Sequence, residues 1–351
     1  MAKMTENDSL SQMLDEPLTT EFRFDDMNQR IVVACLFALI SALGTVGNSL
    51  VIVAVILSRK LRTATNVFVV NLSLADLFTS LILPWNVVAL LSPDGWPIDG
   101  AFCAVAAVVL FTCVSCSVYT LAAIAINRFV IITRPMHKYK TYYSKWKLVV
   151  MVIGTWGISF FIATIPLIFG LGELGYDVKY GTCTHKTSHH LSDYYSMAQS
   201  LLIYPIPMTT IVVCYIAVFR HVRNHAKNIT EQSDSSSTQS QFTHPVRRES
   251  SHRQSISRRQ VEITKNLFYV VCAFFLCITP YCAALVIPKS EPFIPWAGAI
   301  ILLNSCINPV IYATKHPYFK QVIKAILCCK LSSIPEPSSC LRSSQTRWKP
   351  R

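Results

Sequence analysis

One acidic residue, Asp76, lies in the middle of a long apolar run, in the segment Asn71-Leu-Ser-Leu-Ala-Asp76. A charge inside hydrocarbon costs at least ~2.5–3.5 kcal/mol, so it needs a cation or converging polar groups beside it. Polar residues occur at comparable depth in other apolar runs, namely Asn48, Ser117, Asn304 and Asn308. Two interpretations follow: a site for water and a sodium ion at Asp76, or a structural knot of hydrogen bonds that holds helices together.

An arginine, Arg128, ends another apolar run in the sequence Asn127-Arg128-Phe129. As an α-helix, the stretch from Cys103 to Arg128 is roughly 37 Å long at ~1.5 Å per residue, which is enough to reach from one membrane face to the other. Taken alone, Arg128 is explained as an anchor whose stem lies on apolar surface while its guanidinium reaches water.

The elements that position these residues are long apolar helices. The chain is 52% hydrophobic and 15% charged, whereas a soluble domain carries about 25% charged residues. A membrane-spanning helix needs ~20 mostly apolar residues. Seven runs meet that length, at about 31–57, 67–91, 102–132, 147–171, 195–219, 264–287 and 294–314. The sequence therefore predicts an all-α membrane protein, a seven-transmembrane helix bundle over residues 31–314.

The basic residues predict the orientation of this bundle. Lysines and arginines gather after the odd-numbered spans, as in Arg59, Lys60 and Arg62, while the segment 92–101 has none. By the positive-inside rule, residues 1–30 form an extracellular tail and 330–351 a cytosolic one. We expect a multi-pass protein of the plasma membrane whose net charge of +13 reflects topology rather than nucleic-acid binding.

Two cytosolic segments are rich in small polar residues and poor in large apolar ones. They are the third cytosolic loop, at about 224–260, and the tail after residue 330. Such a composition predicts disorder.

The motifs together resemble the rhodopsin-like (class A) G-protein-coupled receptors, from about residue 31 to 329. The matching residues occur in order, each in the expected span: Gly47-Asn48, Asn71-Leu-x-x-Ala-Asp76, Cys103, Asn127-Arg128-Phe129, Trp156, Pro166, Pro207, Tyr215, Phe274, Cys277-x-x-Pro280 and Asn308-Pro309-Val-Ile-Tyr312. The Asn-Arg-aromatic variant, Lys60-Leu-Arg62-x-x-x-Asn66 and Asp94-Gly-Trp96 look most like the melatonin-receptor branch, and they also resemble related orphan and fatty-acid-sensing receptors.

The resemblance implies a role for each matching residue. Arg128 would bind the C-terminal helix of a Gα subunit, with Tyr215 and Tyr312 as its active-state partners. Pro280 would be the bend about which the sixth helix moves, and Phe274 the packing residue that shifts with it. The remaining members of this activation switch are Asn127, Phe129, Asn308 and Pro309. Asp76, Ser117, Asn304 and Asn308 match the family's sodium pocket.

The resemblance also implies covalent features and further partners. Cys103 and Cys183 match a disulfide between the third helix and the second extracellular loop. Residues 315–329 match an amphipathic eighth helix, with palmitoylation expected at Cys328 and Cys329. Asn7 heads an extracellular glycosylation sequon, and Ser250 follows two arginines in a kinase-like pattern. A heterotrimeric G protein, arrestin, receptor kinases and membrane lipid are the expected partners, and no enzymatic activity is expected.

Two positions depart from the family pattern. Asn127 replaces the usual acid before the arginine, and Ile278 replaces a tryptophan two residues before Pro280. Both changes favour an alternative function, a constitutively active or partner-regulated orphan receptor. A seven-span transporter is a remote alternative, because the spans contain no pair of carboxylates.

The ligand is predicted from what the expected pocket lacks. Amine receptors carry an aspartate where this chain has Leu110, and opsins carry a lysine where it has Leu302. The expected pocket residues are mostly apolar: Leu110, Phe111, Val114, Gln199, Tyr281 and Leu285. Such a lining favours a non-aminergic small molecule or a lipid-like one. Basic residues of the second loop, including Lys179 and His185, would bind an anionic ligand or sense pH, or else form a solvated face.

Overall fold

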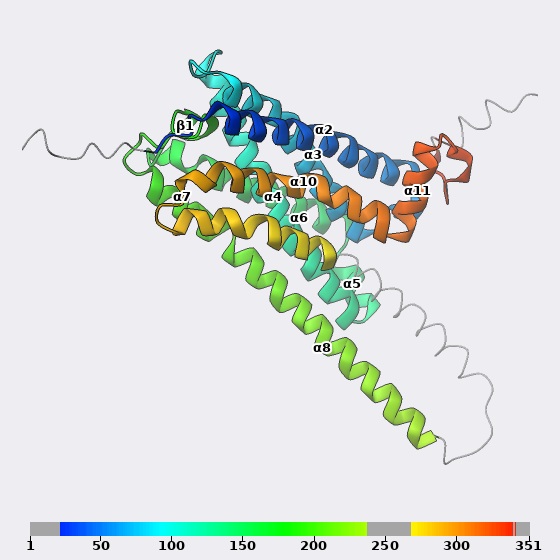
Figure 1. Cartoon of the computed structure of the whole chain (residues 1–351). Helices are drawn as coiled ribbons and strands as arrows, with labels where there is room; N and C mark the ends of the chain where they lie inside the picture. Colours follow the sequence, from blue (N-terminus) through cyan, green and yellow to red (C-terminus); the bar gives the residue numbers. More distant parts are fainter. Residues whose placement is uncertain (1–21, 237–267, 340, 342–351) are drawn as a thin grey trace, which may run out of the picture.

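A computed structural model describes residues 22–236, 268–339 and 341 of the chain. Within them, seven helices are long and apolar enough to cross a membrane: Met27–Leu57, Ala64–Leu91, Gly100–Thr133, Lys145–Phe169, Tyr194–Asn224, Phe268–Val286 and Glu291–Lys315. They pack side by side as one bundle (Figure 1). The predicted all-α seven-helix fold is therefore confirmed.

The structural elements divide these spans as follows. The first four spans are α2 (Met27–Leu57), α3 (Ala64–Leu91), α4 (Gly100–Thr133) and α6 (Lys145–Phe169). The fifth consists of α7 (Ser192–Ile203) and α8 (Pro205–Ser236), and the seventh is α10 (Ile294–Lys315) after the short turn η2 (Glu291–Phe293). Between spans lie η1 (Arg59–Leu61) and α5 (Met136–Tyr142).

The two ends of the bundle differ. At one end, β1 (Leu174–Asp177) and β2 (Thr182–His185) form an antiparallel hairpin between α6 and α7; we call this the hairpin end. At the other end, α11 (Pro317–Leu327) follows α10, with η3 (Leu331–Ser333) after it; we call this the α11 end. The two ends are far apart in Figure 1.

The outer surface of the bundle is apolar. Leu39 is 55% exposed, Ile153 64% and Leu276 72%, each on a different span. Side chains of this kind gain nothing from contact with water, so their outward position fits a bundle surrounded by lipid hydrocarbon. Helix α2 begins four residues before the predicted start, because Asp26 accepts a hydrogen bond from the backbone N–H of Asn28 at 2.9 Å and so caps the helix.

A glycine allows the first and last spans to approach closely. A Cβ atom added at Gly47 would lie 2.9 Å from the ring of Pro309. The neighbouring Asn48 uses this proximity, since its Nδ2 donates to the carbonyl of Ser305 on α10 over 2.8 Å. The Gly47-Asn48 pair thus fixes α2 against α10.

The fifth span departs from the prediction in two ways. It is broken at Tyr204, since Pro205 has no N–H to continue the hydrogen bonds of α7 and instead starts α8. Helix α8 then continues to Ser236, whereas the sequence predicted a disordered loop from about residue 224. Neither glycine nor proline occurs between Arg220 and Pro245, so nothing in that polar stretch terminates the helix.

The predicted disorder of the tail is wrong for its first residues. Ser58 and Pro337 form an antiparallel bridge, and the N–H of Ser338 donates to the carbonyl of Leu57 over 2.8 Å. Ile334, at 3% exposed, packs into the core. One apolar side chain and backbone pairing with the end of α2 are enough to hold this segment, which composition alone does not reveal.

Candidate functional site

The Asp76 carboxylate receives three hydrogen bonds from two other spans. Ser117 Oγ on α4 donates to Oδ1 over 2.9 Å. From α10, Ser305 Oγ donates to Oδ1 over 3.3 Å and Asn308 Nδ2 donates to Oδ2 over 2.8 Å. Asp76 is 1% exposed, so these donors replace water around a buried charge.

Two of the four predicted partners of Asp76 therefore contact it directly, Ser117 and Asn308. Asn48 binds backbone carbonyls instead. Asn304 is buried, and its Oδ1, like that of Asn308, has no hydrogen-bond partner among the described residues. Ser305 was missed, because a lone serine in an apolar run gives no sign of which way it faces.

The oxygen atoms around Asp76 fit a sodium ion. The carboxylate, the hydroxyls of Ser117 and Ser305 that bind it, and the unpaired amide oxygen of Asn308 are hard ligands of the kind that alkali and alkaline-earth cations prefer. Within the described residues, no group of three or more His, Cys, Asp and Glu side chains is placed to hold a metal.

Arg128 lies near the α11 end, at the last turns of α4, and is only 4% exposed. The hydroxyls of Tyr139, Tyr215 and Tyr312 are close enough to interact with its charge. The Oη atoms of Tyr215 and Tyr312 have no hydrogen-bond partner among the described residues. Three of the predicted activation residues, Arg128, Tyr215 and Tyr312, therefore come together from α4, α8 and α10, and Tyr139 of α5, which was not predicted, joins them.

The side chain of Asn127 binds residues of two other elements. Its Oδ1 accepts from Thr65 Oγ1 on α3 over 2.7 Å, and its Nδ2 donates to Tyr139 on α5 over 3.2 Å. A neutral amide thus joins three elements where the family usually has an acid. Phe274 and Ile278 are fully buried in the core of the bundle, on the Phe268–Val286 helix that also carries Pro280.

A cavity of about 490 Å³ occupies the hairpin half of the bundle. All six residues expected in the ligand pocket line it: Leu110, Phe111, Val114, Gln199, Tyr281 and Leu285. Ile278 forms part of the same wall. Ile278 is one helical turn from Phe274, and at the other end of the same helix the ring of Phe268 lies 5.4 Å from that of Tyr215.

The β hairpin covers this cavity and is held in place covalently. Cys103 on α4 and Cys183 on β2 form the disulfide that the sequence predicted. Asp177 fixes the hairpin turn, since its carboxylate accepts from the N–H of Tyr180 at 3.1 Å and from the N–H and Oγ1 of Thr187 at 2.9 and 2.7 Å. The cavity roof is thus built into the fold.

His185 is inside this roof and not on a solvated loop face. Its ring stacks on Phe111, with centroids 4.3 Å apart, and its Nε2 lies 2.8 Å from Gln199 Oε1. Burial lowers the pKa of His185 to about 4, against the opposing effect of the Gln199 hydrogen bond. The ring is therefore neutral at physiological pH. The predicted solvated face is wrong for this histidine, which is buried and lines the cavity instead. On the outer side, Lys186 pairs with Glu173 at 2.9 Å.

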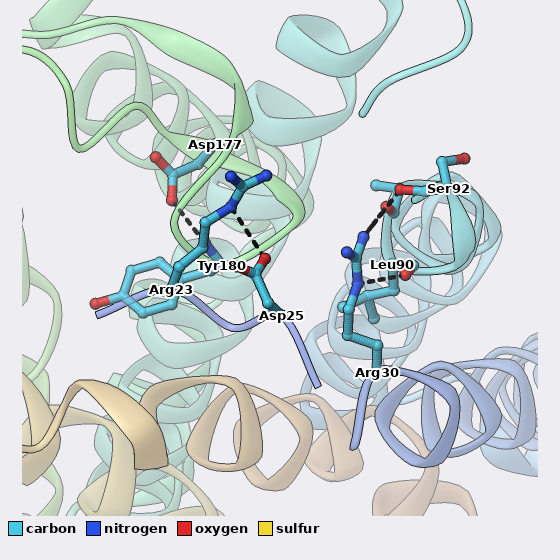
Figure 2. A network of polar contacts seen from close by, with 8 residues as sticks. Arg23, Asp25, Arg30, Leu90, Ser92, Asp177 and Tyr180 are labelled. Atoms are coloured by element: carbon cyan, nitrogen blue, oxygen red, sulfur yellow. Dashed lines mark hydrogen bonds and ion pairs between the residues drawn. The ribbon is translucent and has the colours of Figure 1, made fainter. Parts of the chain in front are cut away.

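The segment before α2 closes the same end of the bundle (Figure 2). The N–H of Phe24 donates to the carbonyl of Lys179 in the hairpin turn over 2.8 Å. Arg30, 5% exposed, donates to the carbonyls of Leu90, Ser92 and Ala89 over 2.7, 3.0 and 3.2 Å. Figure 2 shows its guanidinium aimed at the end of α3, where the unpaired carbonyls of a helix carry partial negative charge.

The structure describes two of the four predicted modification sites. Cys328 and Cys329 are exposed just after α11, where an acyl chain would meet the membrane surface. The predicted amphipathic character of α11 agrees with its packing, since Phe319, Val322 and Ile323 are buried. Asn7 and Ser250 lie outside the described residues.

Comparison with known proteins gives the family. The model of the 7 transmembrane receptor (rhodopsin family) matches residues 47–312. A rhodopsin, GQ-coupled, of Mizuhopecten yessoensis is 27% identical over 94% of this chain, which spans 66% of that protein. A 5-hydroxytryptamine receptor 4 of Cavia porcellus is 26% identical, over 93% of this chain and 86% of the receptor. The human histamine H2 receptor is 23% identical, over 93% and 88%.

Structural comparison agrees. Squid rhodopsin superimposes with a TM-score of 0.74 at 21% identity, covering 93% of this chain and 92% of that one. The melatonin-receptor branch remains a prediction, since the relatives named here are opsins and amine receptors. The family consists of receptors rather than enzymes, so the predicted absence of an enzymatic role agrees with it. The chain belongs to the rhodopsin family of seven-transmembrane receptors.

Proposed function

We propose that this receptor binds an extracellular, non-aminergic small molecule or lipid-like ligand in its cavity and activates a heterotrimeric G protein at the α11 end. The hairpin end then faces outward and the α11 end faces the cytosol of the plasma membrane. One observation carries the proposal. The same bundle has an apolar cavity covered by the β hairpin at one end and a buried arginine, Arg128, among three tyrosines at the other end.

The ligand class follows from the charges in the cavity wall. 5-Hydroxytryptamine and histamine, the ligands in the relatives' names, are amines and need an anionic partner. Leu110 occupies the helix position where amine receptors carry aspartate, and of the described residues that line the cavity Glu291 is the one acid. Glu291 lies in η2 at the mouth, near Lys289. Among the described residues, the buried part of the cavity therefore offers an amine no counter-charge.

A sodium ion bound at Asp76 would regulate the receptor. The oxygens of Asp76, Ser117, Ser305, Asn304 and Asn308 would hold it, and the ion would supply the positive charge that the buried carboxylate lacks. These oxygens belong to α3, α4 and α10. Any shift of α10 against the other two helices would change the site, so bound sodium favours one arrangement of the bundle.

A second candidate function is signalling without ligand. It is favoured by Asn127, because this amide bonds to Thr65 and Tyr139 and cannot form the ion pair that would restrain Arg128. Both functions require a G protein, and they differ in basal activity.

Ligand-free cAMP and calcium signalling in cells expressing the chain tests the proposal, beside Arg128→Ala at matched surface expression. A change in either messenger that Arg128→Ala abolishes supports G-protein coupling and identifies the Gα family. Signalling that survives Arg128→Ala contradicts the role of Arg128. A silent wild type that responds to ligand would support the first function over the second.

A further inference from the structure

Two carboxamide side chains in the cavity wall are bound through their oxygens only. Asn86 Oδ1, on α3, accepts from the backbone N–H of Cys183 over 2.9 Å. Gln199 Oε1, on α7, lies 2.8 Å from Nε2 of His185. Asn86 is 2% exposed and Gln199 5%. Their nitrogens, Asn86 Nδ2 and Gln199 Nε2, have no hydrogen-bond partner among the described residues.

Both amides bind the same strand. Asn86 binds the backbone of Cys183 and Gln199 binds the side chain of His185, two residues further along β2. The spacing of these two residues along the strand is about 6.6 Å. Helices α3 and α7 thus each hold an amide against β2, and both Asn86 and Gln199 line the cavity.

The direction of each amide follows from its partner. A backbone N–H only donates, so Oδ1 of Asn86 must face Cys183 and Nδ2 must face away from it. The ring of His185 is neutral, and in the tautomer that carries its proton on Nε2 this N–H donates to Gln199 Oε1, so that Gln199 Nε2 is not bound by His185. A buried N–H without an acceptor is costly, so two such donors in one apolar cavity indicate that a ligand supplies the acceptors.

The charged residues of the wall point to the same chemistry. The described residues that line the cavity include three charged side chains, Lys179, Lys289 and Glu291. His185 also lines the cavity, but its ring is neutral. Among the described cavity residues, basic side chains thus outnumber acidic ones by two to one, a balance that favours an anionic ligand over an amine. The rest of the wall is mainly aliphatic and aromatic, including Phe111, Val114 and Ile301.

We propose that the cavity binds an acyl ligand, an apolar molecule with a carboxylate or other carbonyl-type acceptor, and that Asn86 Nδ2 and Gln199 Nε2 donate to that acceptor. This inference rests on the proposed function in taking the cavity as the ligand site. It adds the chemical class of the ligand and a recognition residue, Asn86, that the sequence motifs do not single out.

The test compares three probes of equal chain length on the purified full chain in nanodiscs: decanoate, methyl decanoate and decylamine. We expect decanoate and its ester to raise the melting temperature by several degrees and decylamine to leave it unchanged. Asn86→Asp and Gln199→Glu keep the oxygens that bind β2 but replace the free N–H donors with oxygen. Each should weaken decanoate binding about tenfold, and Gln199→Glu should gain binding of decylamine.

Ser200→Ala is the matched control. Ser200 lines the cavity beside Gln199, but its Oγ donates within the helix to the carbonyl of Ser196 over 2.8 Å, so decanoate binding should stay unchanged. Three outcomes overturn the inference: stabilisation by decylamine in the wild type, no stabilisation by decanoate or its ester, or equal stabilisation in wild type and both donor variants. Because this readout contains no G protein, a chain that binds decanoate without signalling contradicts only the proposed function.

Discussion

The side-chain amide of Asn127 donates to the hydroxyl of Tyr139 over 3.2 Å, at the position next to Arg128 where the family usually has an acid. Tyr139 belongs to the short helix α5 that follows α4. The bond therefore ties the end of α4 to the segment after it. Asn127 cannot form an ion pair with Arg128, so its own contribution to the resting state is made through hydrogen bonds between neutral groups.

Asn127→Asp should lower ligand-free signalling. The change is isosteric, Thr65 and Tyr139 can both donate to the new carboxylate, and the added charge lies beside Arg128. A resting-state gain of about 1 kcal/mol would cut the active fraction roughly fivefold. The measurement is basal second messenger at equal surface expression, with Thr65→Val as a control that removes a hydrogen bond without adding charge. Unchanged or higher basal signalling in Asn127→Asp would show that the missing acid does not set basal activity.

Asp76→Asn should abolish a sodium effect on stability. If sodium binds among the oxygens around Asp76, the wild-type receptor melts higher in sodium chloride than in choline chloride at equal ionic strength, by about 2 °C for each kcal/mol of binding. The variant keeps the size of the side chain and removes its charge, so its melting temperature should be the same in both salts. Equal melting of the wild type in both salts would argue for the structural knot of hydrogen bonds instead.

Arg30→Met should destabilise the receptor. The substitution keeps most of the buried volume but removes charge-assisted hydrogen bonds to the carbonyls at the end of α3. A loss of about 2–3 kcal/mol is expected, seen as a fall of roughly 5 °C in melting temperature. Arg23→Met is the matched control (Figure 2): its ion pair with Asp25 is 51% and 58% exposed, so its loss should have little effect. Similar losses in both variants would contradict this account of Arg30.

His185 should make the receptor less stable in acid. Its pKa falls from 6.5 to about 4 on folding, so between those values the unfolded chain binds more protons than the folded one. The free energy of unfolding therefore decreases as the pH drops from 6.5 towards 4, and this contribution is fully present above pH 6.5. His185→Gln should flatten the fall in melting temperature between pH 7 and pH 5. His190→Gln changes an exposed histidine and should leave this pH dependence of the melting temperature as it is in the wild type. The prediction is wrong if His185→Gln also leaves it unchanged.

Most of the fold was predictable because membrane spans are defined by the chain itself. Twenty apolar residues in a row must form a helix in lipid, whatever they pack against. The errors lie in segments beyond the membrane spans, where this constraint does not apply. The polar stretch up to Ser236 stays helical and the segment around Ile334 packs on η1, and both depend on local termination signals or on tertiary contacts.

The site was predictable to the extent that motifs mark it. Asp76, Ser117 and Asn308 converge as predicted, whereas Ser305 needed the rotation of α10 to be known. Asn86 was missed for a similar reason: its role depends on β2, which the disulfide at Cys183 holds over the cavity. The role of a single polar residue can be assigned only when the position of the helix or strand that it contacts is known.

The most direct test of the central claim is nucleotide exchange on purified heterotrimeric G proteins, catalysed by the full chain in nanodiscs. Arg128→Ala is compared with Arg134→Ala, an exposed arginine just beyond the same end of α4. We predict that the wild type and Arg134→Ala accelerate exchange on at least one Gα class, with decanoate present or absent, and that Arg128→Ala does not. Equal exchange by wild type and Arg128→Ala, or no acceleration of any Gα class by the wild type in either condition, would contradict the account.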